Sequence, residues 1–387
     1  MAILPPEHLA HLKLALVPGL GPRLTAALLQ QFGSADAACR ASETELRRIP
    51  QIGDKLASTF AQTLRTLDAQ AELALMERHV VRPVLKSDED YPASLASIPT
   101  APALLYVHGD GWRPGDLGAV ALVGSRMCTA YGRRMAAEIA AGLCRAGVTV
   151  ISGLARGIDG AAHRGALDAG GRTFAVLAGG LAKIYPPEHA ELADEVAQRG
   201  GLISETPMTV APQPGMFPAR NRIISGMSRA VVIVEANLKS GALITAVHAL
   251  EQGREVFAVP GNVDSAASAG CLELIRKGAK LVRSAEDVLE DLRGLSMPVE
   301  PMPHTAKRKP AAEAEAEPLP TPPPPPVVVP KLEPAQQRVW EALATSRHGD
   351  ELARELSLPV GELATLLMKM EMKRLVKRLP GNHYERR

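Results

Sequence analysis

The chain has 387 residues, which is too long for a single ordinary hydrophobic core, so we expect two to four domains. Hydrophobic residues make up 46% of the chain and its net charge is only +2, so a polyanion would have to be bound by local basic patches. The four cysteines form no CxxC pair and no histidine cluster accompanies them, which argues against a metal site or a disulfide scaffold. The sequence shows neither a signal peptide nor an apolar run of membrane length, so we expect a cytoplasmic protein without a membrane partner.

Residues 1–75 are predicted to form a small helical domain. The stretch "VPGLGPRL" (17–24) is echoed by "IPQIGDKL" (49–56), and in both a proline and a tight turn with glycine precede a basic residue and an apolar helix. This repeat is typical of two helix-hairpin-helix units, whose hairpins can offer backbone N–H groups to a DNA phosphate. Ordinary glycine turns in a small helical domain would give the same pattern, and Gln51 replaces Gly19 in the second unit. Contact between this domain and DNA therefore stays open.

Residues 76–295 are predicted to form a doubly wound α/β domain. Between about 118 and 283, short apolar runs alternate with stretches of helical spacing; the runs are "GAVALVG", "GVTVIS", "RTFAVLA", "GLISE", "AVVIVEA" and "REVFAVPG". They are apolar on successive residues, as expected for parallel strands that are buried on both faces. In such a sheet the ligand crevice lies at the carboxyl ends of the strands.

A proline-rich tether is predicted over residues 296–334. This segment holds 13 of the 32 prolines, including "PPPPP" at 322–326. Such a composition cannot form a packed core and favours an extended, semi-rigid linker.

Residues 335–387 are predicted to form a winged helix, because three short amphipathic helices precede a strand pair with a "PGN" turn. In DNA-reading winged helices the third helix enters the major groove. Here that helix carries Glu362 and Glu371 beside Lys369 and has few base-reading side chains. The partner of the tail is therefore predicted to be either double-stranded DNA or a protein.

The residues that carry chemistry lie where the predicted strands end. In chain order these ends read "GSR" (124–126), "SGLARGID" (152–159), "AGGLAKIYP" (178–186), "SE" (204–205), "EANLKSGALIT" (235–245) and "PGN" (260–262). Glycine, serine and basic residues recur there, so backbone and side-chain donors can face a phosphate. Neither G-x-G-x-x-G nor a P-loop is present, so we expect an anion-binding pocket without a nucleotide cofactor.

Seven blocks of this domain resemble the DNA-processing protein A family, also called DprA or Smf. The blocks are "VGSR", "SGLARGIDGAAHRGAL", "AGGLAKIYP", "LISETP", "FPARNRIISGMS", "VEANLKSGALITA" and "GREVFAVPGN", in the family's order. The resemblance implies an extended Rossmann fold without enzymatic activity. It also implies a homodimer that binds single-stranded DNA and loads the RecA recombinase during natural transformation.

The resemblance also suggests roles for single residues. Arg126 matches the arginine that engages the DNA backbone, and Arg220, Asn221 and Arg222 match the "RNR" block. We expect Arg220 and Arg222 to shape the pocket and at least one of them to reach a phosphate, because the arginine fork binds phosphate in a bidentate way. Family members commonly have a basic residue just after "YP", where this chain has Pro187, so Lys183 is expected to take over. The predicted DNA-binding residues are Gly124, Ser125, Arg126, Ser152, Gly153, Arg156, Lys183, Tyr185, Phe217, Arg220, Asn221, Arg222, Lys239 and Ser240.

Two aromatic residues and three titratable ones have competing interpretations. Tyr185 and Phe217 are either core residues or rings that stack on a base, which is worth ~1–3 kcal/mol per base. Glu235, Asp159 and His163 are interpreted as groups that orient loops rather than as acid–base catalysts.

For the dimer contact, the resemblance points to the end of the α/β domain. There "LELIRKGAKLV" (272–282) is a short amphipathic helix that leads into a strand. Ile275 and Leu281 are the predicted interface residues, and the alternative is that both pack inward on the sheet.

A second class of function remains open at this point. Nucleoside-monophosphate phosphoribohydrolases share the fold superfamily, and "KSGALITAVHALE" loosely resembles one of their helix starts. Their "PGGxGT" motif is absent from this chain, so a non-catalytic DNA-binding protein is the leading hypothesis.

Overall fold

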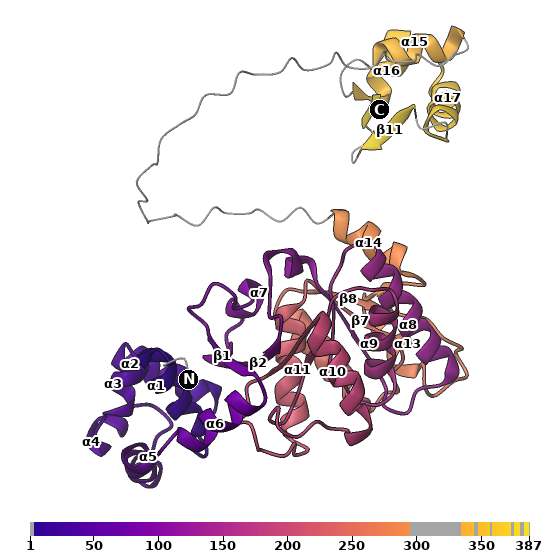
Figure 1. Ribbon diagram of the computed structural model, residues 1–387. Coiled ribbons are helices and arrows are strands. Elements are labelled where there is room, and N and C mark those ends of the chain that lie inside the picture. Colours follow the sequence, from indigo (N-terminus) through magenta and orange to yellow (C-terminus); the bar gives the residue numbers. More distant parts are fainter. Residues whose placement is uncertain are drawn as a thin grey trace, which may run out of the picture. The chain divides into compact units, whose positions relative to one another are not determined.

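The structure is a computed structural model of the chain and describes residues 4–294, 334–343, 347–356, 358–372, 375–379 and 383–386 (Figure 1). The chain divides into two compact units, Met1–Glu300 and Pro301–Arg387. The predicted tether lies outside the described residues, except for Pro334, which begins a helix of the second unit. Among the described residues, no helix is long and apolar enough to cross a membrane.

The first unit begins with a small helical domain that has its own apolar core. The core is formed by α1 (Pro6–Leu16), α2 (Pro22–Phe32), α3 (Ala35–Cys39), α4 (Glu43–Leu46) and α5 (Asp54–Thr66), whereas the following helix α6 (Gln70–Arg78) packs in a cluster with residues of the large sheet. The short helices α3 and α4 begin at capping residues. Ser34 caps α3, and Ser42 forms a capping box with Glu45 at the start of α4.

The predicted sequence repeat is visible in the backbone of this domain. Gly19 and Gln51 occupy equivalent turns with φ of 81° and 76°, and the glycines Gly21 and Gly53 each precede the next long helix with nearly identical dihedral angles. Gln51 thus adopts a left-handed conformation that glycine takes without steric cost. The two hairpins therefore share one geometry despite this substitution, and the helix-hairpin-helix prediction is confirmed.

A nine-stranded sheet forms the centre of the rest of the first unit, in the order β1-β2-β6-β5-β4-β3-β7-β8-β9. The strands from β6 to β9 in this order are parallel, whereas β1 and β2 run antiparallel to their neighbours. The chain passes from β3 through β4 and β5 to β6, and then continues on the other side of β3 with β7. The strand order reverses there, and ligands of doubly wound sheets bind at the carboxyl ends beside such a reversal. The strands are β1 (Val81–Leu85), β2 (Leu104–Gly109), β3 (Val120–Val123), β4 (Val150–Ser152), β5 (Thr173–Val176), β6 (Gly200–Ser204), β7 (Ala230–Ile233), β8 (Glu255–Ala258) and β9 (Lys280–Leu281).

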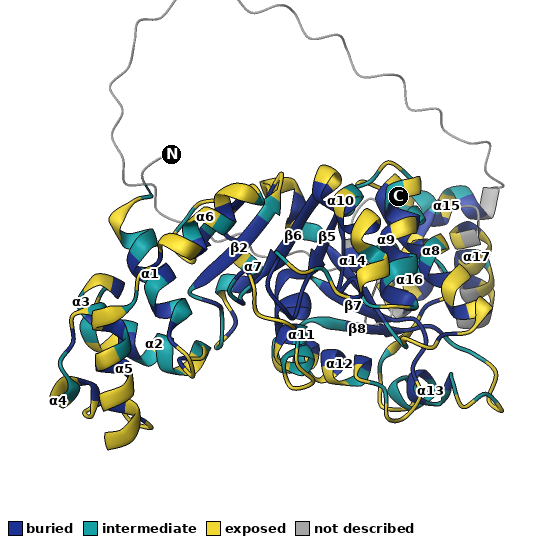
Figure 2. Ribbon diagram, turned by 60° about the horizontal axis from the view of Figure 1, so that its bottom comes forward, coloured by how far each residue is buried: buried dark blue, intermediate teal, exposed yellow. Residues whose placement is uncertain are grey.

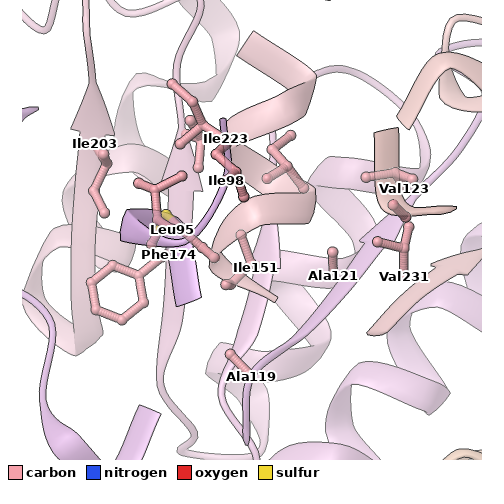
Figure 3. Packing of buried hydrophobic residues seen from close by; sticks show 14 of the residues in the cluster. Leu95, Ile98, Ala119, Ala121, Val123, Ile151, Phe174, Ile203, Ile223 and Val231 are labelled. Carbon is pink, nitrogen blue, oxygen red and sulfur yellow. The ribbon is translucent and has the colours of Figure 1, made fainter. Parts of the chain in front are cut away.

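Helices cover both faces of this sheet, so its central strands are buried on both sides (Figure 2). On β3, Val120 and Leu122 pack in a cluster with residues of α8, α9 and α14, whereas Ala121 and Val123 pack with residues of α7, α11 and α12 (Figure 3). This double burial explains why the strands were recognisable as continuous apolar runs. The helices are α7 (Ala93–Ala96), α8 (Ala130–Arg145), α9 (Ile158–Asp168), α10 (Ala190–Arg199), α11 (Met216–Met227), α12 (Ala242–Glu251), α13 (Ala269–Arg276) and α14 (Ala285–Gly294), with 3₁₀ turns η1 (Pro114–Gly118) and η2 (Pro187–His189).

The sheet extends further than the sequence pattern indicated. The pattern began near residue 118, but β1 and β2 add an antiparallel pair that lies against β6. Pro83 lies within β1, where it lacks a backbone N–H for pairing, and a proline normally argues against a strand. It is accommodated because β1 is the edge strand of the sheet.

The second unit has the predicted winged-helix order. It contains α15 (Pro334–Ala342), β10 (Arg347–His348), α16 (Gly349–Leu356), α17 (Val360–Met372), β11 (Val376–Leu379) and β12 (His383–Arg386). The strands form a small sheet in the order β10-β12-β11, and the helices enclose a core of leucine, valine and methionine side chains. The short β10 was not predicted, since it has only two residues.

Candidate nucleic-acid interface

Two adjoining hollows lie at the carboxyl ends of the central strands of the large sheet. The β5 hollow is lined by residues from the ends of β4 and β5 and by the start of α11, and the β7 hollow by residues from the ends of β3 and β7. Both hollows are lined by Arg126, Ala155, Phe217 and Arg220, so we treat them as one strand-end pocket. All predicted DNA-binding residues line this pocket except Ser152 and Arg222.

Arg126 is exposed at the end of β3, and its loop is fixed from both sides. Ser125 N–H donates to the Glu235 carbonyl over 2.7 Å, and Ile158 N–H donates to the Ser125 carbonyl over 3.2 Å. A Cβ on Gly157 would lie 2.3 Å from the Ser125 oxygen, so only glycine allows this approach. The Arg126 guanidinium lies 4.3 Å from the centre of the Phe217 ring. The buried Asp159 of the β7 hollow interacts with the charge of Arg126, but no ion pair among the described residues engages the guanidinium, so its donors remain available to an anion.

Arg220 is buried in the wall of the pocket, where it is only 5% exposed. Its Nη1 donates to the carbonyl oxygens of Gly153 (2.8 Å) and Val176, which ties the ends of β4 and β5 together. Burial lowers the pKa of Arg220 to about 10, an effect that the nearby Asp159 opposes, so the guanidinium stays protonated at neutral pH. Arg220 therefore supplies both rigidity and a fixed positive charge.

Arg222 lies outside the strand-end pocket, contrary to our expectation that both arginines of the "RNR" block shape it. Residues two positions apart on a helix point to opposite sides, so Arg222 faces away from Arg220. It is 8% exposed, and its Nη2 forms an ion pair with Glu205 after the end of β6. Asn221, which lies between the two arginines in sequence, lines the β7 hollow.

Ser152 is also displaced from the predicted lining. It is fully buried within β4, and its hydroxyl donates to the Leu122 carbonyl over 2.6 Å. The hydroxyl is hydrogen-bonded within the sheet and unavailable to a ligand, because Ser152 is the last residue of the strand rather than the first residue of the loop.

Tyr185 and Phe217 are pocket residues and not core residues. Their ring centres are 6.1 Å apart with an angle of 59° between the planes. Tyr185 is exposed and Phe217 half-buried, and both line the β5 hollow. Two rings that line the pocket beside cationic side chains form a surface on which bases can stack.

The remaining cationic side chains differ in whether they form an ion pair. Arg156 forms an ion pair with Glu188, and this pair lowers the pKa of the Glu188 carboxyl group. The ion pair also neutralises part of the charge of Arg156. Lys183 and Lys239 are exposed, and no ion pair joins either of them to another described residue. Arg126, Lys183 and Lys239 are therefore the accessible charges of the pocket.

The acidic and histidine side chains near the pocket hold loops in place. Glu235 is 2% exposed and accepts hydrogen bonds from Thr129 N–H (2.8 Å) and Thr129 Oγ1 (2.6 Å), which anchors the start of α8. His163 Nδ1 is hydrogen-bonded to Thr173 Oγ1 over 2.8 Å, and burial lowers the pKa of His163 to about 3, so the ring is neutral at pH 7. Within the described ranges, no group of three or more side chains could hold a metal ion.

Sequence reasoning missed two parts of the lining. Pro212 of the loop after β6 lines the β5 hollow, and Asn237 and the exposed Met127 line the β7 hollow. The sequence analysis identified "SE" (204–205) as a strand end, but nothing in the sequence showed that the loop after it reaches the end of β5. The predicted helix-hairpin-helix turn at 17–22 lines a separate groove with Glu205.

Comparison with known proteins gives matches to each folded part of the chain. The family models that match are DNA recombination-mediator protein A over residues 82–293, the DprA winged helix domain over residues 310–382, and a SAM-like helix-hairpin-helix tandem over residues 12–66. Protein Smf of Synechocystis sp. is 34% identical to this chain over 384 residues, which cover 96% of each protein.

Two solved structures are similar to this chain in fold. The X-ray structure of DNA processing protein A from Streptococcus pneumoniae has a TM-score of 0.62 and 33% identity, and covers 73% of this chain and 96% of its own. DNA processing protein A from Helicobacter pylori, described for its unique single-stranded DNA binding mode, has a TM-score of 0.50 and 28% identity, covering 55% and 96%. Because one family model spans more than half of the chain and a relative aligns over nearly its whole length, the chain belongs to the DNA recombination-mediator protein A (DprA/Smf) family.

Proposed function

We propose that this protein binds single-stranded DNA in the strand-end pocket, protects the incoming strand and loads the RecA recombinase on it during natural transformation. In this proposal it acts in the cytoplasm as a homodimer and does not cleave the DNA. The observation that carries the proposal is the set of accessible cations, Arg126, Lys183 and Lys239, around the two rings of Tyr185 and Phe217.

The chemistry of the pocket suits holding a strand rather than reading its sequence. Cations that neutralise phosphates bind all sequences, and rings stack on any base. The buried Arg220 adds a charge that cannot move away, which favours an anion at a fixed place. Recombinase loading is supported by the family and by its description as a recombination mediator.

The first test is replacement of Arg126 by alanine. Because Arg126 is exposed and contacts the half-buried Phe217 ring without forming an ion pair with a described residue, the variant should melt close to the wild type but bind single strands more weakly, whatever their sequence. The slope of log affinity against log salt concentration should fall by roughly one counterion. Fluorescence anisotropy with labelled oligonucleotides at several salt concentrations measures both quantities.

Arg145 provides the matched control for this experiment. It is an exposed arginine at the end of α8, which starts beside the pocket and runs 16 residues away from it. Arg145→Ala should leave affinity and salt slope unchanged. An Arg126→Ala protein that binds like the wild type at every salt concentration would remove Arg126 from the interface.

The winged-helix unit is proposed to serve a different partner from the strand-end pocket. On α17 the exposed side chains include Glu362, Met368 and Glu371 beside Lys369, a mixture with little net charge. We therefore expect a chain that ends at Gly294, without tether and tail, to stay folded and to bind single strands within a few-fold of the full chain. Anisotropy together with a thermal melt tests this, and loss of binding with an unchanged melt would place part of the interface on the tail.

A further inference from the structure

The loop after β5 and the loop after β6 are joined backbone to backbone beside the strand-end pocket. Ala182 N–H donates to the Met208 carbonyl over 3.0 Å, and Gly180 N–H donates to the Val210 carbonyl over 2.9 Å. A Cβ on Gly180 would lie 2.0 Å from the Pro207 oxygen, so the two loops approach as closely as glycine permits. Displacement of one loop must therefore displace the other.

These joined loops carry much of the β5 hollow. Residues 178–186 contribute Ala178, Gly179, Lys183 and Tyr185 to its lining, and the loop after β6 contributes Pro212. One of the accessible cations and one of the two rings of the pocket are thus placed by a segment whose own position depends on residues 207–210.

Helix α6, which lies between the core of the helical domain and β1, contacts this pair of loops through the polar side chain of Glu72 and the apolar side chain of Met76. Glu72 lies on α6 and is 7% exposed, and its Oε1 accepts the backbone N–H of Met208 over 2.8 Å in a buried environment. Met208 is fully buried in a cluster that also contains Met76 of α6 and Leu177 and Leu181 at the end of β5. An acceptor on α6 therefore satisfies a donor that belongs to the pocket loops.

We propose that Glu72 is a positioning residue for the strand-end pocket, through which α6 sets the place of Lys183 and Tyr185. The path runs from Glu72 Oε1 to the Met208 N–H, and from the Met208 carbonyl to the Ala182 N–H, one residue before Lys183. Without the acceptor the buried Met208 N–H loses its only described partner, and the loops shift to hydrate it. The inference rests on the proposed binding of single strands at this pocket.

The test compares Glu72→Met, which keeps the volume and removes the acceptor, with Glu72→Gln, which keeps an acceptor oxygen at Oε1. Binding of a labelled oligothymidylate is measured by anisotropy, and hydrogen exchange is followed for the peptides that cover residues 178–186 and 205–212. We expect Glu72→Met to lose affinity roughly tenfold, the scale set by one unsatisfied buried donor, and to exchange faster in both peptides. Glu72→Gln should stay within twofold of the wild type in affinity and in exchange.

A control variant separates positioning from a general loss of stability. Leu28 of α2 is fully buried in the core of the helical domain, in a cluster that contains neither Met208 nor a residue of α6, so Leu28→Ala destabilises the neighbouring helical domain without touching the connection. It should melt at a lower temperature and still bind like the wild type. Equal losses of affinity in Leu28→Ala and Glu72→Met would overturn the proposal, and so would unchanged exchange of 178–186 in Glu72→Met.

Two further outcomes remain decisive. If Glu72→Met fails to fold, Glu72→Asp is used in its place, because the shorter side chain keeps the charge but moves the acceptor oxygen away from the Met208 N–H. Faster hydrogen exchange of residues 178–186 in this variant supports the proposal, and exchange at the wild-type rate overturns it. If the wild-type protein does not bind the oligonucleotide, the proposed function fails. The exchange data then still show whether Glu72 holds the loops.

Discussion

Replacing Arg220 with alanine is expected to lower the free energy of unfolding by about 2–4 kcal/mol and to remove most of the affinity for single-stranded DNA. The side chain is buried and donates to the carbonyls of Gly153 and Val176, so its removal leaves two acceptors of the pocket wall without this donor. It also removes the positive charge that acts most strongly on the buried Asp159. Chemical denaturation measures the stability, and anisotropy below the melting temperature measures the binding.

Arg222→Ala is the matched comparison for Arg220→Ala. Arg222 is equally buried on the same helix, but its ion pair with Glu205 lies outside the strand-end pocket. Its loss should cost stability of a similar order and leave single-strand binding within a few-fold. If both variants lose affinity to the same extent, stability and not pocket geometry explains the loss, and Arg220 has no special place in the site.

The contrast between these arginines shows what the sequence could and could not predict about the site. The strand ends were identifiable because buried parallel strands are continuous apolar runs and the residues after them are polar or glycine. The pocket lining from Gly124 to Ser240 followed from this, together with the family resemblance. The different roles of Arg220 and Arg222 did not, because side-chain direction on α11 depends on how the helix is rotated against the sheet.

Other features of the fold depended on tertiary contacts that leave little trace in the sequence. The antiparallel strand β1 was missed because it contains Pro83, which is tolerated only at the edge that β1 occupies. The connection from Glu72 to Met208 spans 136 residues, and a buried glutamate on an amphipathic helix looks like any surface glutamate in the sequence. Long-range polar contacts of this kind are determined by the packed structure and not by local pattern.

Leu281→Glu is expected to convert the proposed homodimer into a folded monomer and to weaken single-strand binding by roughly tenfold to a hundredfold, through the loss of a second linked pocket. Leu281 lies on β9, the edge strand of the nine-stranded sheet, and is 48% exposed. A second copy of the chain can pack against an edge strand that exposes an apolar side chain. A two-fold axis would then bring two pockets to one strand of DNA.

The structure separates the two predicted interface residues. Ile275 is only partly exposed and packs against the cluster of core residues between α11, α12 and the sheet, so Ile275→Glu should destabilise the domain whether or not a dimer forms. Leu281→Glu should leave the fold intact, because that side chain is not part of the described core clusters. Leu281 is therefore the position at which assembly can be tested without unfolding the protein.

Sedimentation of the Leu281→Glu protein, combined with circular dichroism and anisotropy, decides between assembly and simple packing. Leu117→Glu is the control, since Leu117 is a similarly exposed leucine, at 53%, in the η1 turn before β3. It should remain a dimer with wild-type affinity, because a charge there changes the surface but not the β9 edge. A Leu281→Glu protein that sediments as a folded dimer would place the contact elsewhere, and a wild-type protein that sediments as a monomer would overturn the proposed homodimer.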